Sequence, residues 1–118
     1  MTGPYAREEV DGERHECRAH LDWVKTCECA VLTCRVTACD PHHLTCVQGK
    51  SMSQTAGDQW AIPVCRRHHN QLHAFGDEAR FWRIQLVDPI ALARRLWAAT
   101  IAAGRFKLEM ATTGEWEK

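Results

Sequence analysis

Histidines concentrate in one stretch of this chain, between residues 40 and 73. Five of the seven histidines lie in two short blocks, Asp40-Pro41-His42-His43 and Cys65-Arg66-Arg67-His68-His69-Asn70-Gln71-Leu72-His73. Histidine is the most common metal ligand in proteins, and its ordinary pKa lies close to neutrality. The stretch therefore predicts a metal site with a proton-transfer group beside it.

The length and the charge of the chain exclude several classes of protein. With 118 residues it is long enough for one domain with one modest core. Its formal net charge is zero, so any nucleic-acid binding must rest on a local basic patch. The longest apolar run, residues 60–65, is far shorter than the ~20 residues that a membrane span needs.

Seven cysteines are unusual in so short a chain. The first residues are polar and contain no apolar core of a signal peptide, so we expect a cytoplasmic protein. In a reducing compartment, metal binding or simple burial explains cysteines better than disulfide bonds do.

The first half of the chain predicts few regular elements. Residues 1–12 are expected to form a flexible leader, and the spacing of apolar residues predicts a helix over residues 13–25. Strand-favouring residues around Pro41 predict two short strands within residues 29–47, joined by a cysteine-rich connection. A polar loop that contains glycine is expected over residues 48–58.

The second half predicts one strand and three helices. A short strand is expected over residues 60–64, followed by a helix over residues 66–74 that Gly76 closes. A second helix is expected between the N-cap residue Asp77 and about Gln85.

The start of the last helix is marked by Asp88 and Pro89, a cap residue followed by proline at the first helical position. Gly104 is expected to stop it, and residues 105–118 read as a polar tail. The domain would then span residues 13–104. One apolar stripe of this helix is expected to be core: Leu92, Ala93, Leu96, Trp97 and Ile101.

The helix over residues 66–74 predicts two metal sites. His69 and His73 are four residues apart, so they share one face and can hold one ion together. His68 points roughly 100° away around the helix and is not expected to join them. The third ligand must come from His42 or His43, and these neighbours on a strand face opposite sides.

The second predicted site is a structural zinc site. Cys65 and His68 form a Cys-x-x-His pair, which suits a tight zinc knuckle. Two more thiolates are required, and we expect Cys29 and Cys34 to supply them, with Cys39 as the nearest competitor. A closed site of this kind would join the strands to the helix in a small domain.

These motifs resemble the HNH endonucleases, also called ββα-metal or His-Me finger nucleases, and in particular small phage and prophage members with a cysteine-rich zinc-binding knuckle. The similarity covers roughly residues 20–98. It rests on residues 21–25, 40–44, 58–69 and 73, 76–78, 81–82, 88–89 and 96–97. It implies an α+β fold with a ββα-metal core, a leading helix and trailing C-terminal helices.

The resemblance also implies a role for each residue of the site. His43 matches the general base, and His42 matches the metal ligand that precedes it. His69 and His73 match the ligands on the metal-binding helix. The family usually has an asparagine that orients the base, and this chain has none at that place. Asp58 is the nearest polar candidate and Gln59 is the next.

The implied activity is hydrolysis of phosphodiester bonds in DNA with low sequence specificity. The ion would be Mg, Mn, Ni or Zn, acting as a Lewis acid. His43 would take a proton from the attacking water, so activity should fall below roughly pH 6. Phosphate contacts are expected from Arg66, Arg67 and Lys50.

The implied partners are DNA and, by analogy with phage proteins, recombination or packaging proteins in a bacterial host cell. The competing hypothesis is a zinc-stapled module that binds nucleic acid or protein without catalysis. A cysteine-based redox protein is disfavoured because the sequence has no Cys-x-x-Cys motif.

Overall fold

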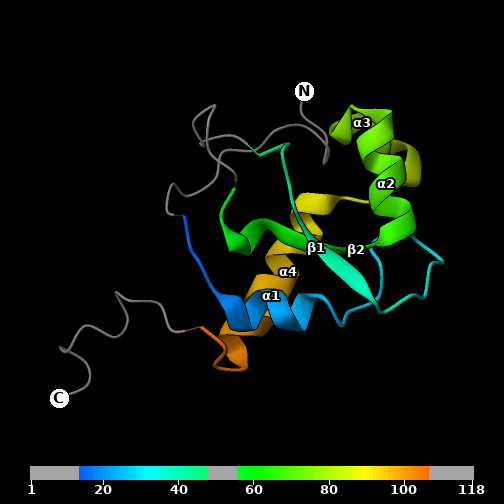
Figure 1. Ribbon diagram of the computed structural model, residues 1–118. Helices are drawn as coiled ribbons and strands as arrows, with labels where there is room; N and C mark the ends of the chain where they lie inside the picture. The colour runs from blue at the N-terminus through cyan, green and yellow to red at the C-terminus, as the bar shows by residue number, and fades with distance from the viewer. Residues whose placement is uncertain (1–13, 48–55, 107–118) are drawn as a thin grey trace, which may run out of the picture.

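The computed structural model describes residues 14–47 and 56–106. Within them the chain forms a small α+β fold with a two-stranded antiparallel sheet and four α-helices (Figure 1). The elements follow in this order: α1 (Arg18–Val24), β1 (Cys39–His43), the 3-10 helix η1 (Asp58–Trp60), β2 (Ala61–Cys65), α2 (Arg66–Phe75), α3 (Glu78–Gln85) and α4 (Pro89–Ala102).

The sheet lies at the centre of the molecule. Figure 1 shows α1 below β1 and β2 in this view, α4 passing behind the strands, and α2 and α3 to their upper right. None of the helices in the described ranges is long and apolar enough to cross a membrane.

The register of the two strands accommodates two prolines. Pro41 lies opposite Pro63, and His42 lies opposite Ile62. Facing residues of an antiparallel pair alternate between hydrogen-bonded and non-bonded positions. The bond from the N–H of Leu44 to the carbonyl of Trp60 sets the alternation, and places the two prolines at a non-bonded position. The sheet therefore loses no hydrogen bond to them.

The helices after β2 begin and end as the sequence predicts. Gly76 follows α2 with φ of 85°, the left-handed conformation that favours glycine at a helix end. The carboxylate of Asp77 accepts from the N–H of Arg80 at the start of α3, and Asp88 caps α4 in the same way through the N–H of Ala91. α2 begins at Arg66, directly after the last residue of β2, Cys65. This direct junction fixes the positions of the side chains in the first turn of α2.

The core is built from β1, β2 and the helices around them. Its largest fully buried side chains include Leu44, Ile62, Trp82 and Ile90. Of the predicted stripe on α4, Ala93 is buried, and Leu92 and Leu96 pack partly buried against this core.

Two expectations for the first half of the chain were wrong. The first helix begins at Arg18 and not at residue 13, because the Cys17 side chain caps it and the preceding backbone is bonded to η1. Residues 29–47 contain only one strand, β1. Residues 29–35 form a tight turn instead, with the N–H of Cys34 bonded to the carbonyl of Val31 and Thr33 at φ of 71°.

Three further expectations lie outside the described residues. These are the leader over residues 1–12, most of the loop over residues 48–58, and all but the beginning of the tail over residues 105–118. The end of that loop, from Asp58, belongs to η1.

The burial of His20 leads us to expect that the protein loses stability in acid. Its side chain is fully buried in α1, where Nδ1 bonds to the hydroxyl of Thr100 and Nε2 has no hydrogen-bond partner. Burial lowers the pKa of His20 to about 4, and Arg105 and His43 also lower it, against an opposing effect of Asp58. The unfolded chain therefore takes up this proton first, and the free energy of unfolding should decrease as the pH falls from about 6.5 towards 4.

The measurement is urea unfolding of the wild type and His20→Gln across this pH range. The wild type should lose stability more steeply than the variant. Parallel curves would contradict the assignment of this acid sensitivity to His20.

Candidate metal centres and the neighbouring histidine

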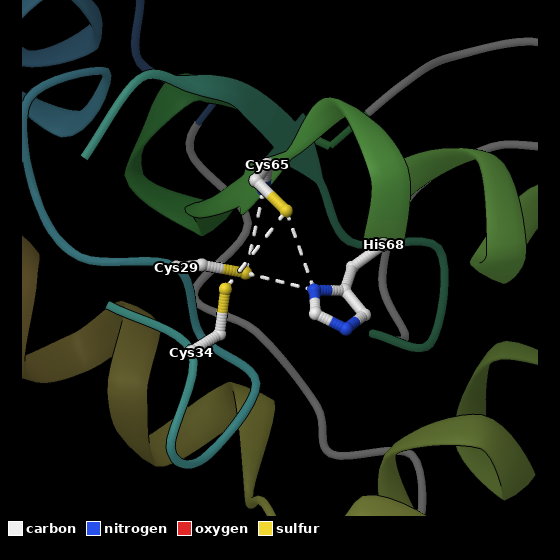
Figure 2. A group of neighbouring side chains, drawn as sticks. All are labelled: Cys29, Cys34, Cys65 and His68. Carbon is white, nitrogen blue, oxygen red and sulfur yellow. Dashed lines mark hydrogen bonds between the residues drawn. The ribbon is translucent and has the colours of Figure 1, made fainter. Parts of the chain in front are cut away.

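The structure brings together the four residues that the sequence predicted for a structural zinc site. The three sulfur atoms of Cys29, Cys34 and Cys65 and Nδ1 of His68 point towards a common centre (Figure 2). All four atoms lie within 4.8 Å of one another. Cys29 and Cys34 come from the tight turn before β1, Cys65 ends β2, and His68 lies in the first turn of α2.

The spacing of these atoms fits a tetrahedral zinc ion. The sulfur atoms of Cys34 and Cys65 are 4.0 Å apart, and Nδ1 of His68 lies 3.3 Å from the sulfur of Cys65 and 3.7 Å from that of Cys29. Zn–S distances near 2.3 Å and Zn–N distances near 2.0–2.1 Å place tetrahedral ligands about 3.3–3.8 Å apart. A Cys₃His group of this geometry can hold a metal ion such as zinc.

The surroundings of Cys65 favour its thiolate. Burial raises the pKa of Cys65, but hydrogen bonds from the N–H of His68, the thiols of Cys29 and Cys34 and the N–H of Arg67 together hold the pKa below its ordinary value. Burial also lowers the pKa of His68, which keeps its ring neutral as a ligand must be.

Cys39, the competitor considered from the sequence, lies outside this group. Its thiol donates to the carbonyls of Cys27 and Val36, both at 3.4 Å. Burial raises the pKa of Cys39 to about 12, so it stays protonated and behaves as a small buried hydrophobic residue.

A second group joins His42 of β1 to His69 and His73 of α2. Nδ1 of His42 lies 3.2 Å from Nε2 of His69, and the same atom of His69 lies 3.1 Å from Nε2 of His73. Nitrogen ligands of a tetrahedral ion with metal–nitrogen distances near 2.0–2.1 Å are about 3.3 Å apart. The donor set and its spacing therefore fit one divalent ion. His68 faces the other cluster, as its place on the helix predicts.

A pocket of about 200 Å³ opens beside this second group. The residues that line it are His42, Thr45, Leu72, His73, Gly76 and Glu78. The second group is thus reached from solvent, whereas Cys29, Cys65 and His68 are buried.

His43 faces away from His42 and contacts η1. Its Nε2 lies 2.8 Å from Oδ1 of Asp58, and Oδ2 of the same carboxylate accepts from the N–H of Cys17 at 2.7 Å. The side chain of His43 remains 28% exposed. An ionised carboxylate can only accept, so His43 carries its proton on Nε2 and leaves Nδ1 as the basic atom.

The structure distinguishes the two candidates for orienting His43. Asp58 contacts it directly. Gln59 is buried and accepts from the N–H of His15 instead.

The site contains two carboxylates that the sequence did not predict. Glu78 bonds to Nε2 of His42 at 2.7 Å, and Asp40 bonds to Nδ1 of His69 at 2.9 Å. Asp40 lies two residues before His42 on the strand, so the period of two could have placed them on one face. Glu78 opens a separate helix, and no local pattern relates it to His42.

The predicted phosphate contacts have different surroundings. Arg66 makes a two-point ion pair with Asp40, at 2.9 and 3.1 Å, while its side chain stays 74% exposed. Arg67 is also exposed at the start of α2. Lys50 lies outside the described residues.

The fold and the two groups define a small α+β protein with a Cys₃His cluster and a three-histidine cluster, each able to hold a metal ion. Residues 11–101, most of the chain, match the family described as "Protein of unknown function (DUF968)", so the chain belongs to this family.

The chain is also similar to the protein named "Uncharacterized protein YdfU" from Escherichia coli (strain K12). The two are 47% identical over 51 residues, which make up 43% of this chain and 14% of the relative. No solved structure gives a significant match to the chain.

Proposed function

We propose that this protein is a metal-dependent endonuclease of the HNH type that hydrolyses phosphodiester bonds in DNA. The observation that carries the proposal is the convergence of His42, His69 and His73, with the next residue of β1, His43, partly exposed and held by the carboxylate of Asp58. The order β1–β2–α2, with ligands on the first strand and on the helix, agrees with a ββα-metal core.

His43 is the residue that we assign as general base. Its Nδ1 lone pair is available because Asp58 holds the proton on Nε2. A neutral imidazole is well suited to take a proton from water at physiological pH. Asp58 would also stabilise the imidazolium ion that forms, since its carboxylate lies on the protonated side of the ring.

The residues that would hold a divalent ion are His42, His69 and His73. When bound, the ion would supply Lewis-acid stabilisation of the charge that develops on the phosphate. The pocket beside these histidines gives substrate access to the same place.

We assign contacts with the phosphate backbone of DNA to the start of α2. Arg66 and Arg67 project from the first turn, where a helix N-terminus favours anions. A formal net charge of zero predicts weak affinity for DNA with little sequence preference.

A second candidate function is a zinc-stapled binding module without catalysis. The closed Cys₃His cluster favours it, because such a site stabilises a fold whatever the fold is used for. This hypothesis leaves the second cluster and the His43–Asp58 contact without a purpose.

Plasmid nicking separates the two candidates. Purified protein should convert supercoiled plasmid to the nicked form with Mn²⁺, Mg²⁺ or Ni²⁺, and should not do so in EDTA. If zinc-loaded, folded protein fails to nick with every metal, the binding module is the better hypothesis.

A further inference from the structure

Glu78 is a buried carboxylate beside the three-histidine cluster, and no step proposed above uses it. Only 7% of its side chain is exposed. Its Oε1 accepts from the N–H of Thr45 at 2.7 Å and from the hydroxyl of the same residue. Its Oε2 accepts from the indole N–H of Trp82 at 3.1 Å.

These contacts decide which nitrogen of His42 carries the proton. The N–H groups of Thr45 and Trp82 can only donate, so both oxygens of Glu78 are acceptors. The remaining contact of Oε2 is with Nε2 of His42 at 2.7 Å. An ionised carboxylate can only accept, so that nitrogen is the donor, which leaves the lone pair of His42 on Nδ1, facing His69.

Asp40 fixes the ring of His69 by the same logic. Its two oxygens accept from Nε and Nη2 of Arg66, so the contact with Nδ1 of His69 requires a proton on that nitrogen. The lone pair of His69 is then on Nε2, the atom that faces both His42 and His73.

Two lone pairs thus face each other across 3.2 Å with no proton between them. Two acceptors at this distance repel each other, and a cation between them removes the repulsion. We propose that Glu78, and to a smaller extent Asp40, are positioning residues that lock His42 and His69 in the tautomers that bind the ion. This inference rests on the three-histidine metal site of the proposed function.

Glu78→Gln tests the proposal with almost no change in size. The glutamine amide can donate to Nε2 of His42, which moves the ring proton to Nδ1, where the ion would bind. Loss of such a partner typically weakens metal binding 10–100-fold. Ni²⁺ binding to untagged, zinc-loaded protein, measured by calorimetry, should weaken by about that factor. Asp40→Asn should weaken it less, because Asp40 is more exposed.

The matched control is Asp77→Asn. It removes the same charge one residue away, keeps the N-cap of α3, and should bind Ni²⁺ as the wild type does. The second measurement is ¹⁵N NMR of the histidine rings in protein whose Cys₃His cluster holds zinc and whose three-histidine cluster is empty. We expect His42 with its proton on Nε2 in the wild type and on Nδ1 in Glu78→Gln.

The outcomes are distinct. Unchanged Ni²⁺ affinity in Glu78→Gln, or a wild-type His42 with its proton on Nδ1, would overturn the positioning role and leave the nuclease proposal standing. A wild type that binds no Ni²⁺ beyond its zinc would overturn the three-histidine metal site itself. The wild-type NMR result decides the tautomer even if Glu78→Gln does not fold.

Discussion

The His43→Ala variant is expected to nick plasmid at least ~100-fold more slowly than the wild type. General-base catalysis typically contributes about 10²–10⁴-fold, and His43 is the histidine of this region that joins neither metal cluster. Its side chain contacts Asp58 of η1 and is only partly buried, so its removal should not disturb the core. The measurement is the initial rate of nicking with Mn²⁺ at saturating protein.

The matched control is His69→Ala. This variant should also lose nicking, but together with Ni²⁺ binding at the three-histidine cluster, whereas His43→Ala should keep that binding. Nicking by His43→Ala at the wild-type rate would show that another group activates the water.

The second large effect is expected from Cys65→Ser. Cys65 ends β2, and its sulfur lies within contact distance of both Cys34 and His68. Structural zinc sites contribute apparent binding energies of about 10–16 kcal/mol, while whole domains are stable by only about 5–15 kcal/mol. Losing even about 3 kcal/mol would lower the Tm by about 12–24 °C. The zinc content should fall by one ion per chain, the ion of the Cys₃His cluster.

Cys39→Ser is the control for this change. Cys39 is also buried and pairs with Cys65 across the sheet, yet it lies outside the Cys₃His cluster. Its variant should retain one zinc and lose much less stability. Equal zinc content in Cys65→Ser and the wild type would refute the structural site.

The second half of the fold could be predicted because its signals are local. Asp77, Asp88 and Gly76 mark helix ends by capping chemistry that involves only a few neighbouring residues. The prediction for the first half of the chain was wrong where hydrogen bonds and contacts between distant residues decide the structure. The Cys29–Arg35 turn has a sequence that favours strands, but it folds around the thiols that face Cys65 and His68.

Periodicity separated the histidines by face, but it left open whether His42 or His43 joins His69 and His73; only the resemblance to HNH nucleases assigned His42. Spacing on the helix separates His68 from His69 and His73, and alternation on the strand separates His42 from His43. The structure has the same arrangement. Glu78 could not be found in this way, because its contact with His42 joins two elements across 36 positions of sequence.

The first turn of α2 contributes a residue to each cluster: His68 belongs to the Cys₃His cluster and His69 to the three-histidine cluster. If both clusters hold an ion, this shared turn would give their loading an order. A metal ion in the Cys₃His cluster would anchor the turn at the end of β2, and its loss would loosen the helix that carries His69 and His73. The imidazole site can be emptied without releasing that anchor, and cation loading in this protein should therefore have a preferred order.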